Sequence, residues 1–180
     1  MEMKKRGLTI LLGAMLLVSA CGSGGGGAPN AGGNPAAQPT HAVVKIATTG
    51  ALSSGTQIGG IDITLNLPTG VSVASSPDSG NPSVLVTDAG KVTASGVAAG
   101  ANTNTLATYV PAANSTPGQV VLHVADANGF AIGEFVTVNC DISMGHTPAT
   151  TDFSISGFDA TDVNGVPLST LGASFSASMQ

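Results

Sequence analysis

Charged and aromatic side chains are scarce in this sequence. The 180 residues include no Trp, one Tyr and five Phe, and only 8% of them are charged. Three of the five basic side chains lie before residue 7, which leaves Lys45 and Lys91 against nine acidic side chains once Glu2 is set aside. Two lysines cannot neutralise a row of phosphates, so nucleic acid is excluded as a partner.

Catalytic motifs are also missing. The chain has no GxSxG or SxxK arrangement for a nucleophilic serine, and no HExxH or CxxC spacing for a metal. Beyond residue 6 it contains no Arg and, apart from Glu134, no Glu, so acid–base and electrophilic groups are few. The sequence therefore predicts a noncatalytic protein without a cofactor or a metal.

The beginning of the chain has the features of a secretory leader. A basic start is followed by an apolar run from Leu8 to Val18 and then by small residues. The run is shorter than the roughly 20 residues of an ordinary membrane span, and it suits a signal-peptide core of roughly 7–15. We therefore expect residues 1–20 to be a signal peptide.

The segment Leu17-Val18-Ser19-Ala20-Cys21 resembles the lipobox of bacterial lipoproteins. That resemblance implies cleavage before Cys21, acylation of its thiol with diacylglycerol, and anchoring through two or three acyl chains, such as palmitate. Gly22 stands where an Asp would signal retention in the inner membrane, so the analogy favours the outer membrane of a bacterial cell envelope, on its periplasmic or outward-facing side. An ordinary cleaved leader with an unmodified Cys21 is the alternative.

Residues 21–40 are predicted to form a flexible tether. Their Gly, Pro, Ala and Asn side chains cannot bury enough surface to fold. A chain of this length and composition reaches on the order of 25 Å. The string GSGGGG matches a nucleotide-binding pattern only formally, because no strand precedes it and no helix follows it.

From residue 41 onward, apolar and polar residues alternate with a period of two. In Ile61–Leu67 the odd positions are apolar, and in Phe135–Ile142 the even positions, including Val138 and Cys140, share an apolar face. The pattern places the Cys140 thiol in the core and His123 on a polar side. Strands are predicted at 42–48, 61–67, 71–74, 84–87, 91–95, 106–110, 119–125, 135–142, 152–156 and 173–178. Residues 41–180 should therefore form an all-β domain, a two-sheet antiparallel β-sandwich.

The order of strands and turns resembles that of cohesin domains, a jelly-roll sandwich shared by some carbohydrate-binding modules. The segments GTQIGGIDITLNLPTGVSV, GQVVLHVADANGFAIGEFVTVNCDI and FSISGFDATDVNGVPL carry this resemblance. It implies a noncatalytic module that binds or scaffolds another envelope or secreted protein through a sheet face. The polar rows Asp62, Thr64 and Asn66 on one strand and Val121, His123 and Ala125 on another are the candidate contacts.

Two other ligands and a passive role remain as alternatives. Polysaccharide could bind beside Tyr109, although the chain lacks the Trp and Tyr platform that sugar binding commonly uses. Calcium could bind Asp159, Asp162 and Asn164, but residues 126–129 and 162–165 both end in Asn-Gly, the strongest signal for a hairpin turn. A structural envelope lipoprotein with no discrete ligand is the third possibility.

Overall fold

Two antiparallel sheets make up the described part of the protein, residues 37–180 of a computed structural model. The predicted signal peptide (1–20), Cys21 and residues 21–36 of the predicted tether lie outside the described residues. Residues 37–180 form a compact unit with its own core. No helix between residues 37 and 180 is long and apolar enough to cross a bilayer.

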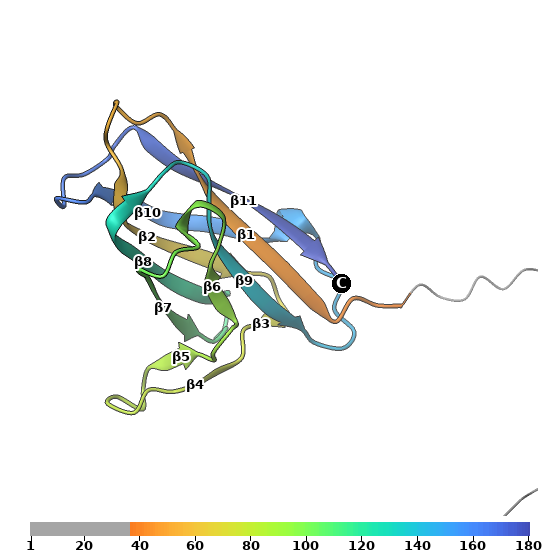
Figure 1. Ribbon diagram of the computed structural model, residues 1–180. Coiled ribbons are helices and arrows are strands. Elements are labelled where there is room, and N and C mark those ends of the chain that lie inside the picture. The colour runs from red at the N-terminus through yellow and green to blue at the C-terminus, as the bar shows by residue number, and fades with distance from the viewer. Residues whose placement is uncertain (1–36) are drawn as a thin grey trace, which may run out of the picture. The chain divides into compact units, whose positions relative to one another are not determined.

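Sheet A has five strands in the order β11-β1-β9-β3, with β6 also paired to β9 (Figure 1). Its strands are β1 (His41–Gly50), β3 (Val71–Ser72), β6 (Val92–Ala94), β9 (Glu134–Ile142) and β11 (Leu171–Met179). β1 is central, because it pairs with β11 on one side and β9 on the other.

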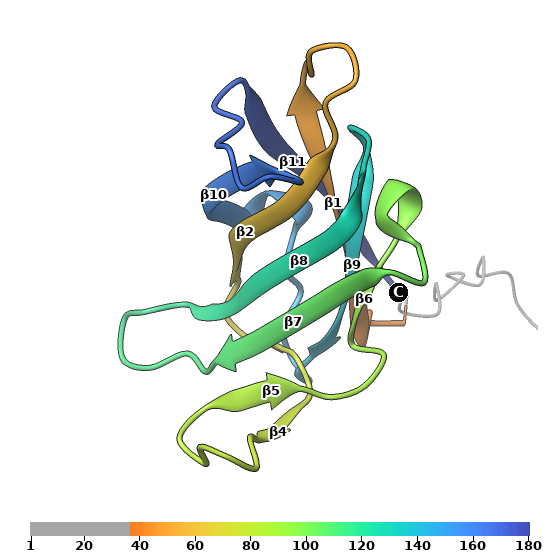
Figure 2. The same cartoon turned by 60° about the vertical axis from the view of Figure 1, so that its left-hand side comes forward.

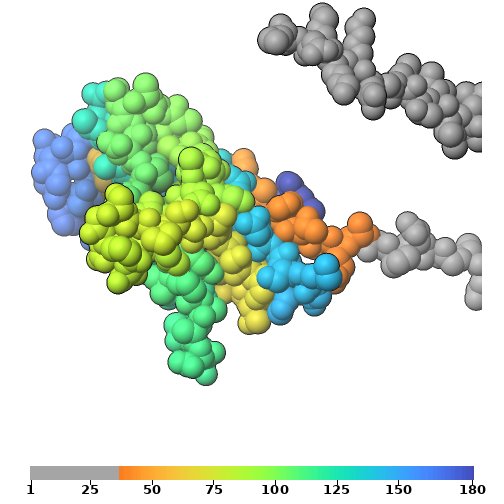
Figure 3. Space-filling view, turned by 90° about the horizontal axis from the view of Figure 1, so that it is seen from below, coloured from red at the N-terminus to blue at the C-terminus, as the bar shows by residue number. Residues whose placement is uncertain are grey.

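Sheet B has six strands in the order β10-β2-β8-β7-β5-β4 (Figure 2). Its strands are β2 (Ile58–Leu67), β4 (Ser75–Pro77), β5 (Leu85–Thr87), β7 (Thr103–Val110), β8 (Gly118–Phe130) and β10 (Ser154–Asp162). Two single turns of 3-10 helix, η1 (Gly96–Ala98) and η2 (Thr150–Asp152), lie in connections. The loop between β7 and β8 projects from the body of the sandwich (Figure 3). The predicted two-sheet antiparallel β-sandwich is confirmed.

The core lies between the sheets and is built by the alternation seen in the sequence. The inward residues of β1, β2, β8 and β9 are almost completely buried, and β-branched and leucine side chains predominate among them. The large side chains of Phe130, Phe135 and Phe153 are buried in the core, whereas those of Phe158 and Phe175 are only half-buried. Cys140 is buried with the inward residues of β9, as predicted.

The hairpin predicted at residues 126–129 is wrong. β8 continues through this segment to Phe130, and the register with β2 shifts so that Ile58 faces Phe130 while Gly60 faces Ala125. The segment is therefore an extended bulge within the strand, in which residues 126–129 lie opposite Gly59. A carboxylate oxygen of Asp126 accepts a hydrogen bond from Thr103 Oγ1 at 2.7 Å, which with other hydrogen bonds lowers the Asp126 pKa below its usual value.

Several strand bounds also differ from the prediction: β2 begins at Ile58 instead of 61, β7 begins at Thr103 instead of 106, and β3 ends at Ser72 instead of 74. The strand expected at 152–156 begins at Ser154 and runs to Asp162, because Asp152 belongs to η2 and its carboxylate accepts a hydrogen bond from the Ala149 amide at 2.8 Å. β4 was not predicted, since its Ser-Ser-Pro sequence has no alternation. It pairs with β5 over three residues at the border of sheet B.

Candidate binding face

One face of sheet B gathers the polar residues that the sequence pattern singled out. Side chains of β10, β2, β8 and β7 that point away from sheet A form this outer face, which Figure 2 shows toward the viewer. The register aligns them in three rows across the strands: Asp159, Asp62, His123 and Leu106; Ser156, Thr64, Val121 and Thr108; and Ser154, Asn66, Gln119 and Val110. The candidates from the β2 and β8 patterns therefore share one continuous surface.

Hydrogen bonds join the side chains of the polar half of this face, over β10 and β2. The Asn66 amide donates to Ser154 Oγ and to Ser156 Oγ, each at 3.2 Å. The Gln119 amide donates to Asn66 Oδ1 at 2.9 Å and extends the row onto β8. These bonds fix the side chains in place, so the polar half offers a pre-organised surface.

The other half of the face, over β8 and β7, carries exposed apolar side chains. Leu106 is 54% exposed and Val110 is 46% exposed, and both belong to β7. Val121 lies between them on the neighbouring strand and is half-buried. Single apolar residues are ordinary on protein surfaces, but a group on one side of a sheet is typical of an interaction site.

A shallow hollow of about 380 Å³ lies where the polar and apolar halves meet. Gly60 and Ala125 face each other across β2 and β8 and leave space because neither has a long side chain. Its walls include Asp62, Asn104, Leu106, His123, Asp159 and Thr161. His123 Nδ1 is hydrogen-bonded to an Asp62 carboxylate oxygen, and both side chains are well exposed, at 50% and 62%.

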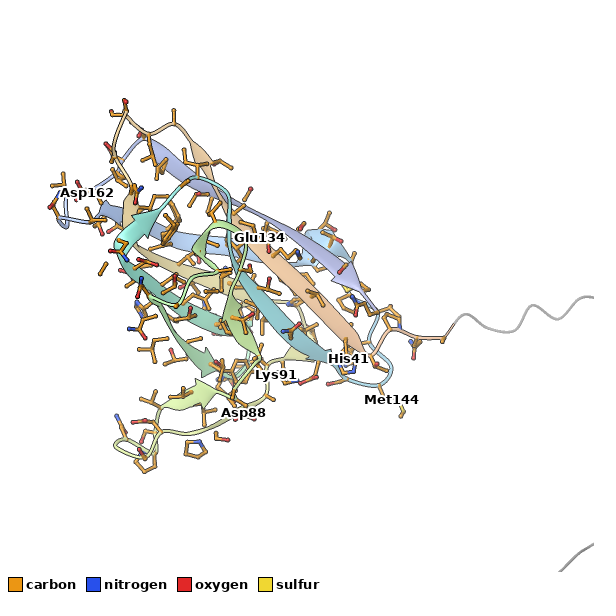
Figure 4. All side chains as sticks on the ribbon, viewed as in Figure 1. His41, Asp88, Lys91, Glu134, Met144 and Asp162 are labelled. Carbon is orange, nitrogen blue, oxygen red and sulfur yellow. The ribbon has the colours of Figure 1, made fainter. Side chains whose placement is uncertain are left out.

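Both lysines of the described residues contact sheet A, the other sheet of the sandwich; Lys45 lies on β1 and Lys91 directly precedes β6. Lys45 Nζ is 3.2 Å from Glu134 Oε2, and Lys91 Nζ is 3.2 Å from Asp141 Oδ2. Hydrogen bonding from Ser95 and the contact with Lys45 hold the pKa of Glu134 below its usual value. Figure 4 shows Lys91 and Glu134 among the side chains on this sheet. The charges of sheet A therefore neutralise one another locally.

The outer face of sheet B has no such compensation. Asp62 and Asp159 face each other across β2 and β10, and no lysine among residues 37–180 pairs with either of them. His123 is the basic group beside Asp62, and it carries charge only when protonated. The hollow is therefore an acidic region next to an apolar one.

Tyr109 is not part of this face. It pairs with Val120 and Leu85 and points to the inner side of sheet B, where it is half-buried. Burial raises the pKa of its hydroxyl. A second, mainly apolar hollow of about 490 Å³ lies beside it and is lined by Val84, Leu85 and Pro111 among others.

The candidate calcium ligands do not converge. Asp159 lies on the outer face of sheet B, whereas Asp162 is the last residue of β10, where the following turn begins (Figure 4). Asp162 Oδ1 accepts hydrogen bonds from the Asn164 and Val166 amides, each at 2.8 Å, and these bonds lower the pKa of Asp162. Within residues 37–180 no group of three His, Cys, Asp or Glu side chains could hold a metal ion. Asp162 and Asn164 thus serve the predicted hairpin turn.

Sequence reasoning missed the apolar half of the face. The segment Leu106–Val110 has apolar residues at both odd and even positions, so its pattern does not tell which side faces the core. The register with β8 decides this, because Ala107 faces the buried Leu122 while Leu106 faces His123. Only the pairing of distant strands could reveal that Leu106 and Val110 point outward.

No protein-family model and no curated protein matches the chain. Among solved structures, the chain is similar to a non-cellulosomal cohesin from the hyperthermophilic archaeon Archaeoglobus fulgidus, with 18% sequence identity and a TM-score of 0.43. The match covers 72% of this chain and 73% of that one. The strand order and register by themselves define residues 37–180 as an antiparallel β-sandwich.

Proposed function

We propose that the protein is a noncatalytic binding module that recognises another cell-envelope or secreted protein through the outer face of sheet B. The observation that carries this proposal is the exposed apolar pair Leu106 and Val110 beside an acidic hollow, on a sheet face whose other half is polar. An apolar centre with a polar surround is the usual organisation of a protein interface.

The charges on this face favour a partner with a basic side chain next to an apolar one. Asp62 and Asp159 would attract a Lys or Arg of the partner into the hollow, and its aliphatic stem would pack on Leu106. Neither lysine of residues 37–180 contacts this face, so within that range the two carboxylates are open to a basic side chain of a partner.

The hollow is too exposed to solvent to favour catalysis. His123 and Asp62 resemble part of an acid–base arrangement, but both are at least half exposed to solvent. Electrostatic stabilisation of a transition state depends on a site from which water is largely excluded. The exposed pair is therefore better suited to binding than to chemistry.

The proposal includes a membrane anchor at Cys21, which rests on the lipobox resemblance. Acyl chains on this residue would hold the domain at a bacterial envelope membrane, with the outer membrane favoured, and the Gly-rich segment would let it extend from the surface. Radiolabelled palmitate should be incorporated into the wild-type chain and not into Cys21→Ser. Equal incorporation by both chains would rule out this anchor.

The protein partner is tested by capture. Residues 22–180 immobilised on beads should retain a specific protein from the envelope and secreted fractions of the source organism, and soluble domain should compete it away. Retention of no protein above the bead control would contradict the scaffolding function and would favour a passive envelope role.

Polysaccharide binding beside Tyr109 is the second candidate, because the hollow there is mainly apolar and includes an aromatic ring. A sugar would stack on the half-exposed ring. Binding to a polysaccharide array that is lost in Tyr109→Ala and retained in Leu106→Lys would support this function. Absence of any glycan binding would remove it.

A further inference from the structure

The four borders of the two sheets differ in how well they are protected against further pairing. β10 at one border of sheet B has register shifts after Ser156 and after Thr161 and carries Asp159. β4 at the other border has three residues and ends in Pro77. β3 and β6 are only two and three residues long. Bulges, charges, prolines and short length are the devices that keep sheet edges from pairing with other chains.

β11 has none of these protections. Its nine residues, Leu171–Met179, contain no charge and no proline, and its pairing with β1 continues without a register shift. Figure 1 shows β11 at the border of sheet A beside β1. It is therefore a long, regular and uncharged edge.

The backbone of β11 presents unpaired groups along this edge. His41 and Gln180 exchange both backbone hydrogen bonds, at 3.0 and 2.8 Å, so the even-numbered residues of β11 bond to β1 and the odd-numbered ones point outward. Among residues 37–180, Thr150 Oγ1 donates to the Ala177 carbonyl at 3.1 Å and Leu171 donates to Leu168 at 3.0 Å. Between them, the outward backbone groups of Ala173 and Phe175 form no hydrogen bond with any other part of residues 37–180.

The same side of the sandwich is incompletely covered. Most of the half-buried apolar side chains that pack against the core lie along β10, β11 and their connection: Ile155, Phe158, Leu168, Leu171, Ala173, Phe175, Ala177 and Met179. A further strand added beside β11 would cover part of this apolar surface and would satisfy the open backbone groups.

We propose that β11 of a second copy of this chain is that strand, added antiparallel about a twofold axis at Ser174. In this register Ala173 of each copy faces the partner's Phe175, and these two pairs use the open backbone groups between Leu171 and Ala177. Small Ala lies opposite large Phe on the inner side, and Ser174 lies opposite the partner's Ser174 on the outer side.

Charge also favours a second copy at this edge. Nine acidic side chains against two lysines make two copies of residues 37–180 repel each other over most orientations. The β11 edge has no acidic residue, so two copies can approach along it without placing like charges opposite each other.

A pair of cysteine variants in residues 22–180 tests the register. Ser174→Cys would place two thiols on directly opposite residues, whose Cα atoms are about 4.5 Å apart in such pairs and within range of a disulfide. Ser176→Cys is equally placed on the exposed side of β11, but its two copies would be separated by four residues, about 14 Å. Cys140 is buried and adds no accessible thiol.

The expected result is a disulfide-linked dimer of Ser174→Cys under mild oxidation, while Ser176→Cys forms no disulfide link between copies. In sedimentation velocity, the wild-type domain should form dimer with rising concentration, and Ser174→Lys should lose it while keeping the wild-type melting temperature. Equal linking of both cysteine variants, or a wild-type domain that stays monomeric at every concentration, would overturn the proposal.

Discussion

Val138 is a residue on which both the core and the strand register depend. It is completely buried in β9, between Val44 of β1 and Val92 of β6. Val138→Asp would place an unpaired charge in the core, so we expect loss of the fold, measured by circular dichroism and thermal unfolding. Thr93→Asp, on the exposed side of β6, is the control and should fold normally. A folded Val138→Asp variant would contradict the register.

The buried thiol of Cys140 makes the free energy of unfolding depend on pH in the alkaline range. Burial raises the pKa of its thiol from 9.0 to about 12. Above pH 9 the unfolded chain loses this proton while the native protein keeps it, so the free energy of unfolding falls as pH rises, by at most about 1.4 kcal/mol per pH unit. Urea unfolding between about pH 8 and 11 should show this decline in the wild type and a weaker one in Cys140→Ala. Identical pH profiles would show that the thiol is not responsible.

At the scale of single residues, alternation predicted burial well. The buried position of Cys140 and the outward position of His123 follow from a period of two within one strand. Leu106 and Val110 could not be placed in this way, because their strand has no polar side and its orientation depends on pairing with β8.

At the scale of elements, the bulge in β8 shows where local signals are ambiguous. Asn128-Gly129 predicts a hairpin because Gly accepts a positive φ, and Gly129 does have a φ of +72°. A β-bulge can also contain a glycine with a positive φ, so this conformation does not distinguish a bulge from a hairpin turn. The pairing of Phe130 with Ile58, which is far away in the sequence, decides between the two structures.

Gly129 provides a test of the bulge. A Cβ there would lie 2.7 Å from Gln57 Cβ and 2.8 Å from Val163 Cγ1, in addition to the cost of a positive φ. Gly129→Ala should therefore lower the free energy of unfolding by about 1–3 kcal/mol more than the conformational cost alone. Gly165→Ala is the matched control, because Gly165 has a φ of +80° and nothing within 4 Å of an added Cβ. Equal losses in urea unfolding would contradict the packing around the bulge.

The border strands of the sheets could not be identified from the sequence either. Alternation predicts that residues 173–178 form a strand, but the position of that strand in the sheet depends on which distant strand pairs with it. The unprotected edge of β11 becomes visible only when β1 is known to have β11 on one side and β9 on the other.

At the scale of the whole molecule, the two outer faces of the sandwich differ in character. Of the two lysines among residues 37–180, Lys45 lies on β1 and Lys91 directly precedes β6, and each contacts a carboxylate of sheet A. The outer face of sheet B carries two carboxylates that no lysine of residues 37–180 contacts, next to exposed Leu106 and Val110. Composition alone predicts an acidic protein, and only the fold separates its charges between two faces.

The most direct test of the binding face is the affinity of the captured partner for two matched variants, measured by isothermal titration. Leu106→Lys places a charge in the apolar half of the outer face of sheet B, and Thr93→Lys places the same charge on sheet A. The first should weaken binding about fivefold or more, since removing or charging an apolar contact on which binding depends costs over about 1 kcal/mol, while the second should leave the affinity unchanged. Wild-type affinity in Leu106→Lys, with both variants folded, would contradict the proposal that this face binds the partner.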